Sequence, residues 1–304
     1  MSAANASPSH ACDAMVIGGG PAGVSAAIQA ARAGLDTLLI ERGSTLGGTT
    51  TVGGVNYPGL FHAWGRQGIR GYGWGIVERC MRECGDELPD FSVVPERHWM
   101  HQVKVNRFVF AMLCDEAVQE AGCRLRLHTM PAALEATDDG WRVTLCDKAG
   151  LSAVHARFVI DCTGDANAVA LAGGELRVSS ETHQPGTQVC RISGYDLAEL
   201  DLPSIDAALA EAVERGGVHP HDVGWASSEP SIEGFLKKHG ENANHVPGIN
   251  ARDSAGRTAI ELAGRGAVLR VFRFLKKQPG LDNLTLEPLQ ASVWVDAGRG
   301  CRSR

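Results

Sequence analysis

Residues 13–43 read DAMVIGGGPAGVSAAIQAARAGLDTLLIERG. A short apolar run leads into a glycine turn, an alanine-rich stretch follows, and a second apolar run, TLLI, comes next. Short apolar runs bounded by turn residues predict buried strands. The alanine-rich stretch predicts a helix from Val24 to Ala33, which Gly34 ends. The segment is therefore expected to form a β-α-β unit.

The turn contains Gly18, Gly20 and Gly23 in the spacing G-x-G-x-x-G. Gly18 allows the tight turn, Gly20 lets backbone N–H groups reach a pyrophosphate, and Gly23 lets helix and strand pack closely. The start of the helix directs its partial positive charge at the phosphates. We count Pro21 and Ala22 with this predicted cofactor-binding loop.

Glu41 ends the second apolar run, about 20 residues beyond the glycines, where an acidic side chain can accept hydrogen bonds from an adenosine ribose. Glycine-rich turns also serve plain packing of a strand on a helix, so a purely structural turn is the alternative. The flanking strands, the helix and Glu41 together favour dinucleotide binding.

Composition limits the other classes of function. The chain has 304 residues, of which 44% are hydrophobic, enough for one large or two medium domains. A net charge of −6 and the lack of a basic stripe argue against nucleic acid as a partner. We therefore expect a small-molecule substrate.

The amino-terminal stretch has no features of an export signal, and residues 1–12 are expected to form a disordered tail. No run approaches the ~18 apolar residues that cross a bilayer, which predicts a soluble protein without a membrane partner. Nine cysteines without a C-x-x-C pair fit reduced thiols. The expected location is cytoplasmic.

The choice of cofactor depends on residues 41–54, ERGSTLGGTTTVGG. A glutamate-arginine pair followed by Leu-Gly-Gly resembles the FAD-binding domains of glutathione-reductase-like flavoproteins. The resemblance implies that Gly47 and Gly48 lie against the pyrophosphate and the flavin side of FAD, with Arg42 and Thr49 beside them. Two glycines remove side chains where backbone must approach a ligand. A flexible loop is the alternative.

The middle of the chain supports the same cofactor. Residues 106–122 predict a helix, RLRLHT a strand, and residues 132–137, 141–146 and 152–160 an antiparallel meander. A β-meander between the third and fourth parallel strands is characteristic of the resembled flavoprotein fold rather than of nicotinamide dehydrogenases. The expected fold class is α/β, an FAD/NAD(P)-binding Rossmann-type domain with a parallel sheet, helices and a meander.

The meander ends in FVIDCTGDANAVALAGG, residues 158–174. In similar flavoproteins a strand that ends in Thr-Gly marks the return to the cofactor, which implies that Thr163 and Gly164 approach FAD. Asp165 is expected to cap the next helix, with cofactor or ribityl contact as the alternative. These motifs, with LGGTTTVGGVN and HWMHQVKVN, resemble FAD-dependent oxidoreductases over about residues 13 to 290.

Candidate catalytic residues lie in residues 55–84, which follow the flavin loop and are rich in aromatics and glycine. His62 is the candidate base and Arg66 the candidate anchor for substrate or anion. The alternative is that His62 is a packed or surface histidine. His98 and His101, and the run HPHD at 219–222, lack a third ligand at a recurring distance, so no metal is expected.

The chain is expected to divide into an FAD-binding domain, an α+β substrate or cap domain, and a tail. The ranges are 13–175, with a flavin-side insertion at 47–105, then 176–290, and 291–304. Helices are expected in the cap at 203–217, 231–242 and 253–278.

The resembled family closes its first domain with a last strand and a glycine-rich helix start, and no such segment follows LEPLQASVWV. The resemblance therefore implies a truncated or altered carboxyl terminus, with an exposed sheet edge around residues 158–172 that would favour homo-oligomers. The expected function is hydride transfer between a small organic substrate and FAD. The alternatives are a non-catalytic flavin-binding chain and an NAD(P)-dependent dehydrogenase.

Overall fold

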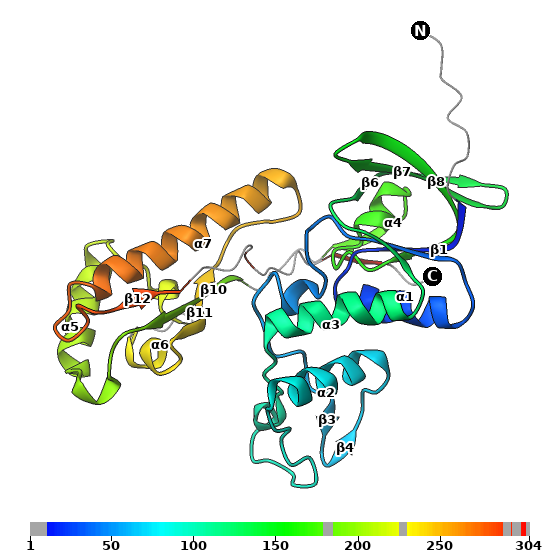
Figure 1. Ribbon diagram of the computed structural model, residues 1–304. Helices are drawn as coiled ribbons and strands as arrows, with labels where there is room; N and C mark the ends of the chain where they lie inside the picture. Colours follow the sequence, from blue (N-terminus) through cyan, green and yellow to red (C-terminus); the bar gives the residue numbers. More distant parts are fainter. Residues whose placement is uncertain (1–10, 179–184, 225–229, 288–292, 294–298, 302–304) are drawn as a thin grey trace. The chain divides into compact units, whose positions relative to one another are not determined.

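The computed structural model describes residues 11–178, 185–224, 230–287, 293 and 299–301. The described residues form two compact units (Figure 1). Unit 1 holds residues 11–52, 56–178 and 299–301, and unit 2 holds residues 53–55 and the described part of 185–293. The division falls after Val178, and residues 299–301, which the sequence assigns to a separate tail, belong to unit 1.

Unit 1 begins with the expected β-α-β unit. Strand β1 (Ala11–Ile17) is parallel to β2 (Thr37–Ile40), and helix α1 (Pro21–Arg32) connects them. Every residue of β2 is buried. The helix begins at Pro21, earlier than the predicted Val24, because proline suits the first position of a helix. The strand also takes in residues 11 and 12, which were expected to belong to the tail.

The main sheet of unit 1 has the strand order β5-β2-β1-β8-β7-β6. The first four strands are parallel, whereas β7 and β6 continue the sheet as an antiparallel meander. This confirms the predicted Rossmann-type class and its meander. The new strands are β5 (Arg124–Arg126), β6 (Met130–Thr137), β7 (Gly140–Asp147) and β8 (Gly150–Asp161).

Strand β8 serves both parts of the sheet. Its first half pairs with β7 as far as Ala156, and its second half pairs with β1. Within the described residues, 157–161 pair with β1 alone. Phe158 is 54% exposed, and Leu171, in helix α4 (Asn167–Leu171), is also exposed. Exposed apolar side chains thus lie at and near the end of β8.

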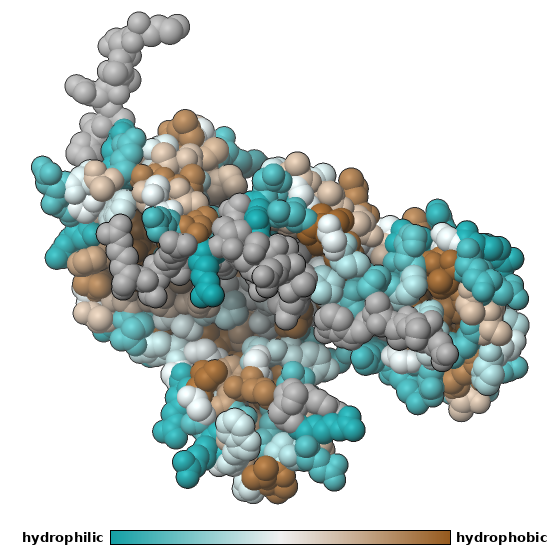
Figure 2. Space-filling view, turned by 180° about the vertical axis from the view of Figure 1, so that it is seen from behind, coloured by the Kyte–Doolittle hydropathy of each residue, from teal (hydrophilic) through white to brown (hydrophobic). Residues whose placement is uncertain are grey.

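The segment between the phosphate loop and β5 forms a lobe of unit 1. Exposed hydrophobic side chains are visible on the surface of the molecule in Figure 2. In this lobe the exposed large hydrophobic residues include Trp64, Val93 and Val94. Trp64 is 85% exposed at the tip of a hairpin and has a φ of 49°. Its elements are η1 (Gly48–Thr50), β3 (His62–Ala63), β4 (Arg66–Gln67), α2 (Tyr72–Cys84), η2 (His98–His101) and α3 (Arg107–Glu120).

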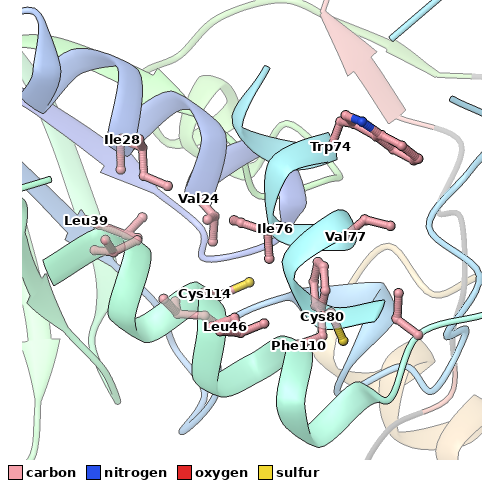
Figure 3. Packing of buried hydrophobic residues seen from close by; sticks show 14 of the residues in the cluster. Val24, Ile28, Leu39, Leu46, Trp74, Ile76, Val77, Cys80, Phe110 and Cys114 are labelled. Atoms are coloured by element: carbon pink, nitrogen blue, oxygen red, sulfur yellow. The ribbon is translucent and has the colours of Figure 1, made fainter. Parts of the chain in front are cut away.

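Helices α1, α2 and α3 bury one hydrophobic core (Figure 3). The Asn106 side chain caps α3 by accepting hydrogen bonds from the N–H groups of Phe108 and Val109. Leu46, fully buried in the same core, anchors the loop that follows β2. The cluster includes Val24, Ile28, Leu39, Leu46, Trp74, Ile76, Val77, Cys80, Phe110 and Cys114.

Unit 2 contains a sheet of order β11-β10-β12, against which helix α7 (Ser254–Leu275) packs. The pair β9 (Leu176–Val178) and β13 (Arg299–Cys301) is antiparallel and belongs to unit 1. The other elements of unit 2 are β10 (Gly186–Ser193), η3 (Leu197–Glu199), α5 (Leu202–Glu214), η4 (Pro220–Asp222), α6 (Glu233–Lys237), β11 (Gly240–Val246) and β12 (Thr285–Leu286).

The predicted helix at 231–242 is wrong in its second half. Helix α6 ends at Lys237, and the chain turns through His239 and Gly240, both with positive φ, into β11. The backbone of β11 pairs antiparallel with β10. Pairing with a neighbouring strand therefore overrides the helical spacing, because tertiary context outweighs local propensity.

The HPHD run at residues 219–222 has a structural role, because it links η4 to helix α7. Asp222 is 3% exposed and accepts hydrogen bonds of 2.8 Å from both Nε and Nη2 of Arg270 on α7. It also accepts the backbone N–H of His219, which completes a capping box for η4. Within the residues that the structure describes, no group of three or more His, Cys, Asp or Glu residues could hold a metal ion.

A second buried polar group in unit 2 makes its stability depend on pH. His245 on β11 is 2% exposed, and its Nδ1 lies 3.2 Å from Oγ1 of Thr187 on β10. Burial, helped by His221 and Lys238, lowers the pKa of His245 to about 4. The unfolded chain therefore binds more protons between about pH 4 and pH 6.5, and stability falls as pH falls through that range.

We expect the loss of unfolding free energy between pH 7 and pH 5 to be about 2 kcal/mol smaller in His245→Gln than in the wild type. Urea unfolding of both proteins at the two pH values measures this difference. The pKa of His62 is also lowered, but His62 is present in both proteins, so its contribution cancels. An equal loss in both proteins contradicts the assignment.

Candidate functional site

At two positions of the glycine turn between β1 and α1, close contacts with other backbone atoms require glycine. A Cβ atom at Gly18, whose φ is +105°, would lie 2.5 Å from the carbonyl oxygen of Cys162. A Cβ atom at Gly23 would lie 1.8 Å from the carbonyl oxygen of Gly18. Neither position can carry a side chain. Gly18 and Gly23 therefore have the packing roles that the spacing predicts.

Gly20 differs from these two glycines. Its φ is −69°, which any residue can adopt, and a Cβ atom there would have no protein atom within 4 Å. Gly20 is also the N-cap of α1, and no side chain caps that end of the helix. An uncapped helix start beside open space is an anion-binding geometry. The space at Gly20 is therefore available to a ligand.

The Gly47-Gly48 pair lies directly on this turn. The N–H of Gly47 donates a 2.8 Å hydrogen bond to the carbonyl oxygen of Gly19. A Cβ atom at Gly48 would lie 2.9 Å from Cα of Gly20. Both glycines have positive φ, and Thr49 beside them is exposed. The loop is thus held by contacts with the turn, in contrast to the alternative of a flexible loop.

Glu41 lies where the predicted ribose acceptor should be, but its carboxylate already contacts backbone. Oε2 accepts the N–H of Gly19 at 2.7 Å, and Oε1 accepts the N–H of Gly43 at 2.7 Å. Arg42, the next residue, is exposed. Glu41 therefore joins the glycine turn to the loop after β2, which the sequence did not reveal.

The Thr163-Gly164-Asp165 run follows β8 at the same edge of the sheet. Gly164 has a φ of +85°, is exposed, and would have no atom within 4 Å of a Cβ. The predicted N-cap role of Asp165 is wrong. The N-cap of α4 is Ala166, whose side chain makes no capping hydrogen bond.

Two other side chains accept hydrogen bonds from backbone N–H groups in the first turn of α4. Thr163 Oγ1 accepts the N–H of Asn167 at 2.8 Å, and Asp161 Oδ2 accepts the N–H of Val169 at 3.0 Å. Asp161 Oδ1 also accepts the N–H and the hydroxyl of Thr163. Asp161 was missed in the sequence, although it ends an apolar strand as Glu41 does.

A cavity of about 380 Å³ opens beside Glu41. The N–H of Thr129 donates to the carbonyl oxygen of Glu41 at 2.9 Å, and the N–H of His128 donates to that of Gly43 at 3.0 Å. The sequence offered no motif for this cavity, because it combines the end of β5 with the β7–β8 turn. It is lined by Arg126, Leu127, His128, Thr129, Asp147, Lys148 and Ala149.

His62 lies in an aromatic cluster of the lobe. Its ring stacks on Phe91 with a centroid distance of 3.6 Å and contacts Trp74 edge-on at 5.1 Å. Burial lowers the pKa of His62, with smaller contributions from His101 and Arg70. Its Nδ1 is buried without a hydrogen-bond partner. This environment agrees with a packed histidine that is neutral at pH 7.

Arg66 is exposed on β4, which pairs with the strand of His62. Ala63 is the residue directly opposite Arg66 in this hairpin. The structure therefore brings the two candidate catalytic residues into one hairpin. The glycines, Glu41 and Thr163 gather instead at the carboxyl ends of β1, β2 and β8.

Comparison with protein families decides the class. Residues 13–302 match the model of the family described as FAD dependent oxidoreductase. The chain belongs to the FAD-dependent oxidoreductase family. FAD is the cofactor of this family, as the glycine turn and the Gly-Gly pair predict. No helix among the described residues is both long and apolar enough to span a membrane.

Curated relatives of this FAD-dependent oxidoreductase match it in part. Digeranylgeranylglycerophospholipid reductase 1 of Methanothermobacter thermautotrophicus is 28% identical over 173 residues, 53% of this chain and 41% of the relative. Thiamine thiazole synthase of Methanococcus vannielii is 29% identical over 171 residues, 52% of this chain and 58% of the relative. The chain thus spans about half the length of these relatives.

Solved structures give a weaker likeness. An anhydrotetracycline hydroxylase from Streptomyces rimosus aligns with a TM-score of 0.44 and 20% identity. The alignment covers 62% of this chain and 38% of the hydroxylase.

Proposed function

We propose that this chain transfers a hydride between a small organic substrate and FAD. The observation that carries the proposal is the open space at Gly20. It lies next to the uncapped start of α1, and Gly48 is close to the backbone of Gly20. No contact within the chain requires glycine at this helix start. The open position is therefore suited to bind a pyrophosphate group. The residues present therefore fit FAD.

Two groups of residues would hold the cofactor. The helix start would hold the pyrophosphate, and a carboxylate can accept hydrogen bonds from ribose hydroxyls. The same edge of the sheet would hold the flavin side, where Gly164 leaves room. The proposed cofactor-binding residues are Gly18, Gly20, Pro21, Ala22, Gly23, Glu41, Arg42, Gly47, Gly48, Thr49, Thr163, Gly164 and Asp165.

The cavity beside Glu41 is the proposed place of the adenine ring. Thr129 in its lining contacts the backbone carbonyl of Glu41, and its volume is about 380 Å³. Residues 126–129 contribute to the lining, and polar groups there can meet the polar edge of a base. This assigns to the cofactor residues that carry no sequence motif.

FAD, when bound, supplies the group that accepts or donates the hydride. The chain must then position the substrate and, for an alcohol or amine donor, remove a proton. We propose His62 as the base and Arg66 as the anchor of substrate or anion. The supporting observation is the Nδ1 atom of His62, which has no hydrogen-bond partner and can accept a proton.

His62→Phe should separate this role from packing. Phenylalanine can keep the stack on Phe91 and removes the buried, unpartnered Nδ1, so folding and FAD content should not change. Loss of a general base should lower kcat about 100-fold or more. Turnover by the FAD-loaded variant, measured beside the wild type, checks this. An unchanged kcat assigns His62 to packing alone.

Anaerobic mixing of the FAD-loaded chain with organic donors tests the function. A panel of alcohols, amines and reduced nicotinamides is added, and the visible absorbance of oxidised flavin is followed. Loss of absorbance with an organic donor supports the proposal. Reduction by a nicotinamide alone, or by no donor, contradicts the proposed substrate class.

A further inference from the structure

We propose that Glu41 is a positioning residue that sets the conformation of the phosphate loop before FAD arrives. The proposal rests on the proposed FAD site and adds a second role to a residue otherwise assigned to the ribose. Its basis is that both carboxylate oxygens of Glu41 contact backbone amides of the chain itself.

The two contacts are short and charge-assisted. Oε2 of Glu41 accepts the N–H of Gly19, and Oε1 accepts the N–H of Gly43, each at 2.7 Å. Hydrogen bonds to an ionised carboxylate are about twice as strong as those between neutral groups. Glu41 is half-buried and Gly19 is buried, so water competes less for these amides than at an exposed site. One side chain thus ties together the two loops that flank the site.

The carbonyl group of Gly19 is fixed as well. It accepts the N–H of Gly47 at 2.8 Å, while Glu41 holds the N–H on the other side of the same residue. Both peptide planes next to Gly19 are therefore restrained. Because the trans peptide is planar, the N–H of Gly20 points opposite to the Gly19 carbonyl. Glu41 and Gly47 together set the direction of a donor in the predicted pyrophosphate site.

This role is compatible with ribose binding. A carboxylate has about four lone-pair positions, and the two amides occupy one on each oxygen. The remaining lone-pair positions can accept hydrogen bonds from ribose hydroxyls while both loops stay in place. A loop that is already ordered loses less conformational entropy when the ligand binds. Glu41 should therefore contribute even to ligands that lack ribose hydroxyls.

Amide exchange in the cofactor-free, full-length chain gives the first test. Glu41→Gln keeps the length of the side chain, but its NH₂ group would face one of the two N–H donors, so at most one contact can persist. We expect exchange of at least one of the Gly19 and Gly43 amides to rise about tenfold or more. Glu135→Gln is the matched control. It removes an exposed carboxylate on β6 that pairs with Arg142 on β7, and it should leave both amides unchanged. Unchanged exchange in Glu41→Gln overturns the proposal.

Nucleotide binding gives the second test. The affinities of wild type and Glu41→Gln are measured for ADP and for 2′,3′-dideoxy-ADP, which lacks both hydroxyls. A positioning role predicts that the variant binds both nucleotides about tenfold more weakly, or about 1.4 kcal/mol. A role confined to the ribose predicts a loss for ADP only, and that result overturns the proposal.

The two tests separate this proposal from the proposed function. If the wild type binds neither nucleotide, the FAD site is wrong, and the exchange data still decide whether Glu41 positions the loop. If Glu41→Gln does not fold, Glu41→Asp takes its place in both tests, because a side chain shorter by one methylene cannot reach both the Gly19 and the Gly43 amide. Unchanged exchange of both amides in Glu41→Asp overturns the proposal.

Discussion

Gly20→Val is expected to weaken FAD binding by at least about 100-fold, or about 2.7 kcal/mol, while the chain remains folded. A valine side chain would fill the space in which the backbone is expected to meet the pyrophosphate. The backbone leaves room for a side chain, because φ at Gly20 is −69° and no atom lies within 4 Å of a Cβ there. The loss should therefore appear in binding rather than in folding.

Isothermal titration with FAD and a thermal melt of the cofactor-free chain measure the two effects separately. Gly75→Val is the matched control, because Gly75 is exposed on α2 and a Cβ there also meets open space. The control should bind FAD as the wild type does. If Gly20→Val retains wild-type affinity, the cofactor does not lie at the start of α1.

Arg270→Ala is expected to destabilise unit 2 by about 3–5 kcal/mol. The substitution leaves the Asp222 carboxylate, which is 3% exposed, without the two hydrogen bonds that Arg270 donates. Asp222 would retain the N–H of His219, which does not neutralise a buried charge. Helix α7 would also lose its link to η4.

Denaturant unfolding followed by circular dichroism measures this change. Arg265→Ala on the same helix is the control, because Arg265 pairs with Glu261 at a more exposed position and should cost less than about 1 kcal/mol. Equal effects of the two substitutions would show that burial does not govern the Asp222 pair.

The first unit was predictable because its signals are local. Gly18 and Gly23 are close to each other in the chain, and their spacing reports a backbone geometry that admits no side chain. The meander was predictable for the same reason, since short turns join β6, β7 and β8. Gly20 stays a predicted ligand position, based on its place at the start of α1.

Contacts between distant segments were not predictable in this way. Phe91 stacks on His62 although the two are far apart in the chain, so the aromatic environment of the candidate base leaves no local pattern. Asp165 precedes α4 as an N-cap would, yet Thr163 and Asp161 satisfy the first turn because the end of β8 directs them there. β11 required a partner strand that the sequence does not identify.

We propose that this chain holds FAD in the glycine cradle formed by Gly20, Gly48 and the start of α1. The test is the amount of FAD retained after the full-length chain is saturated with FAD and passed through a gel-filtration column. We expect close to one FAD per chain, with the visible absorbance of oxidised flavin, and almost none retained by Gly20→Val. A folded wild-type chain that retains no FAD but binds a nicotinamide dinucleotide would show that the cradle holds another cofactor.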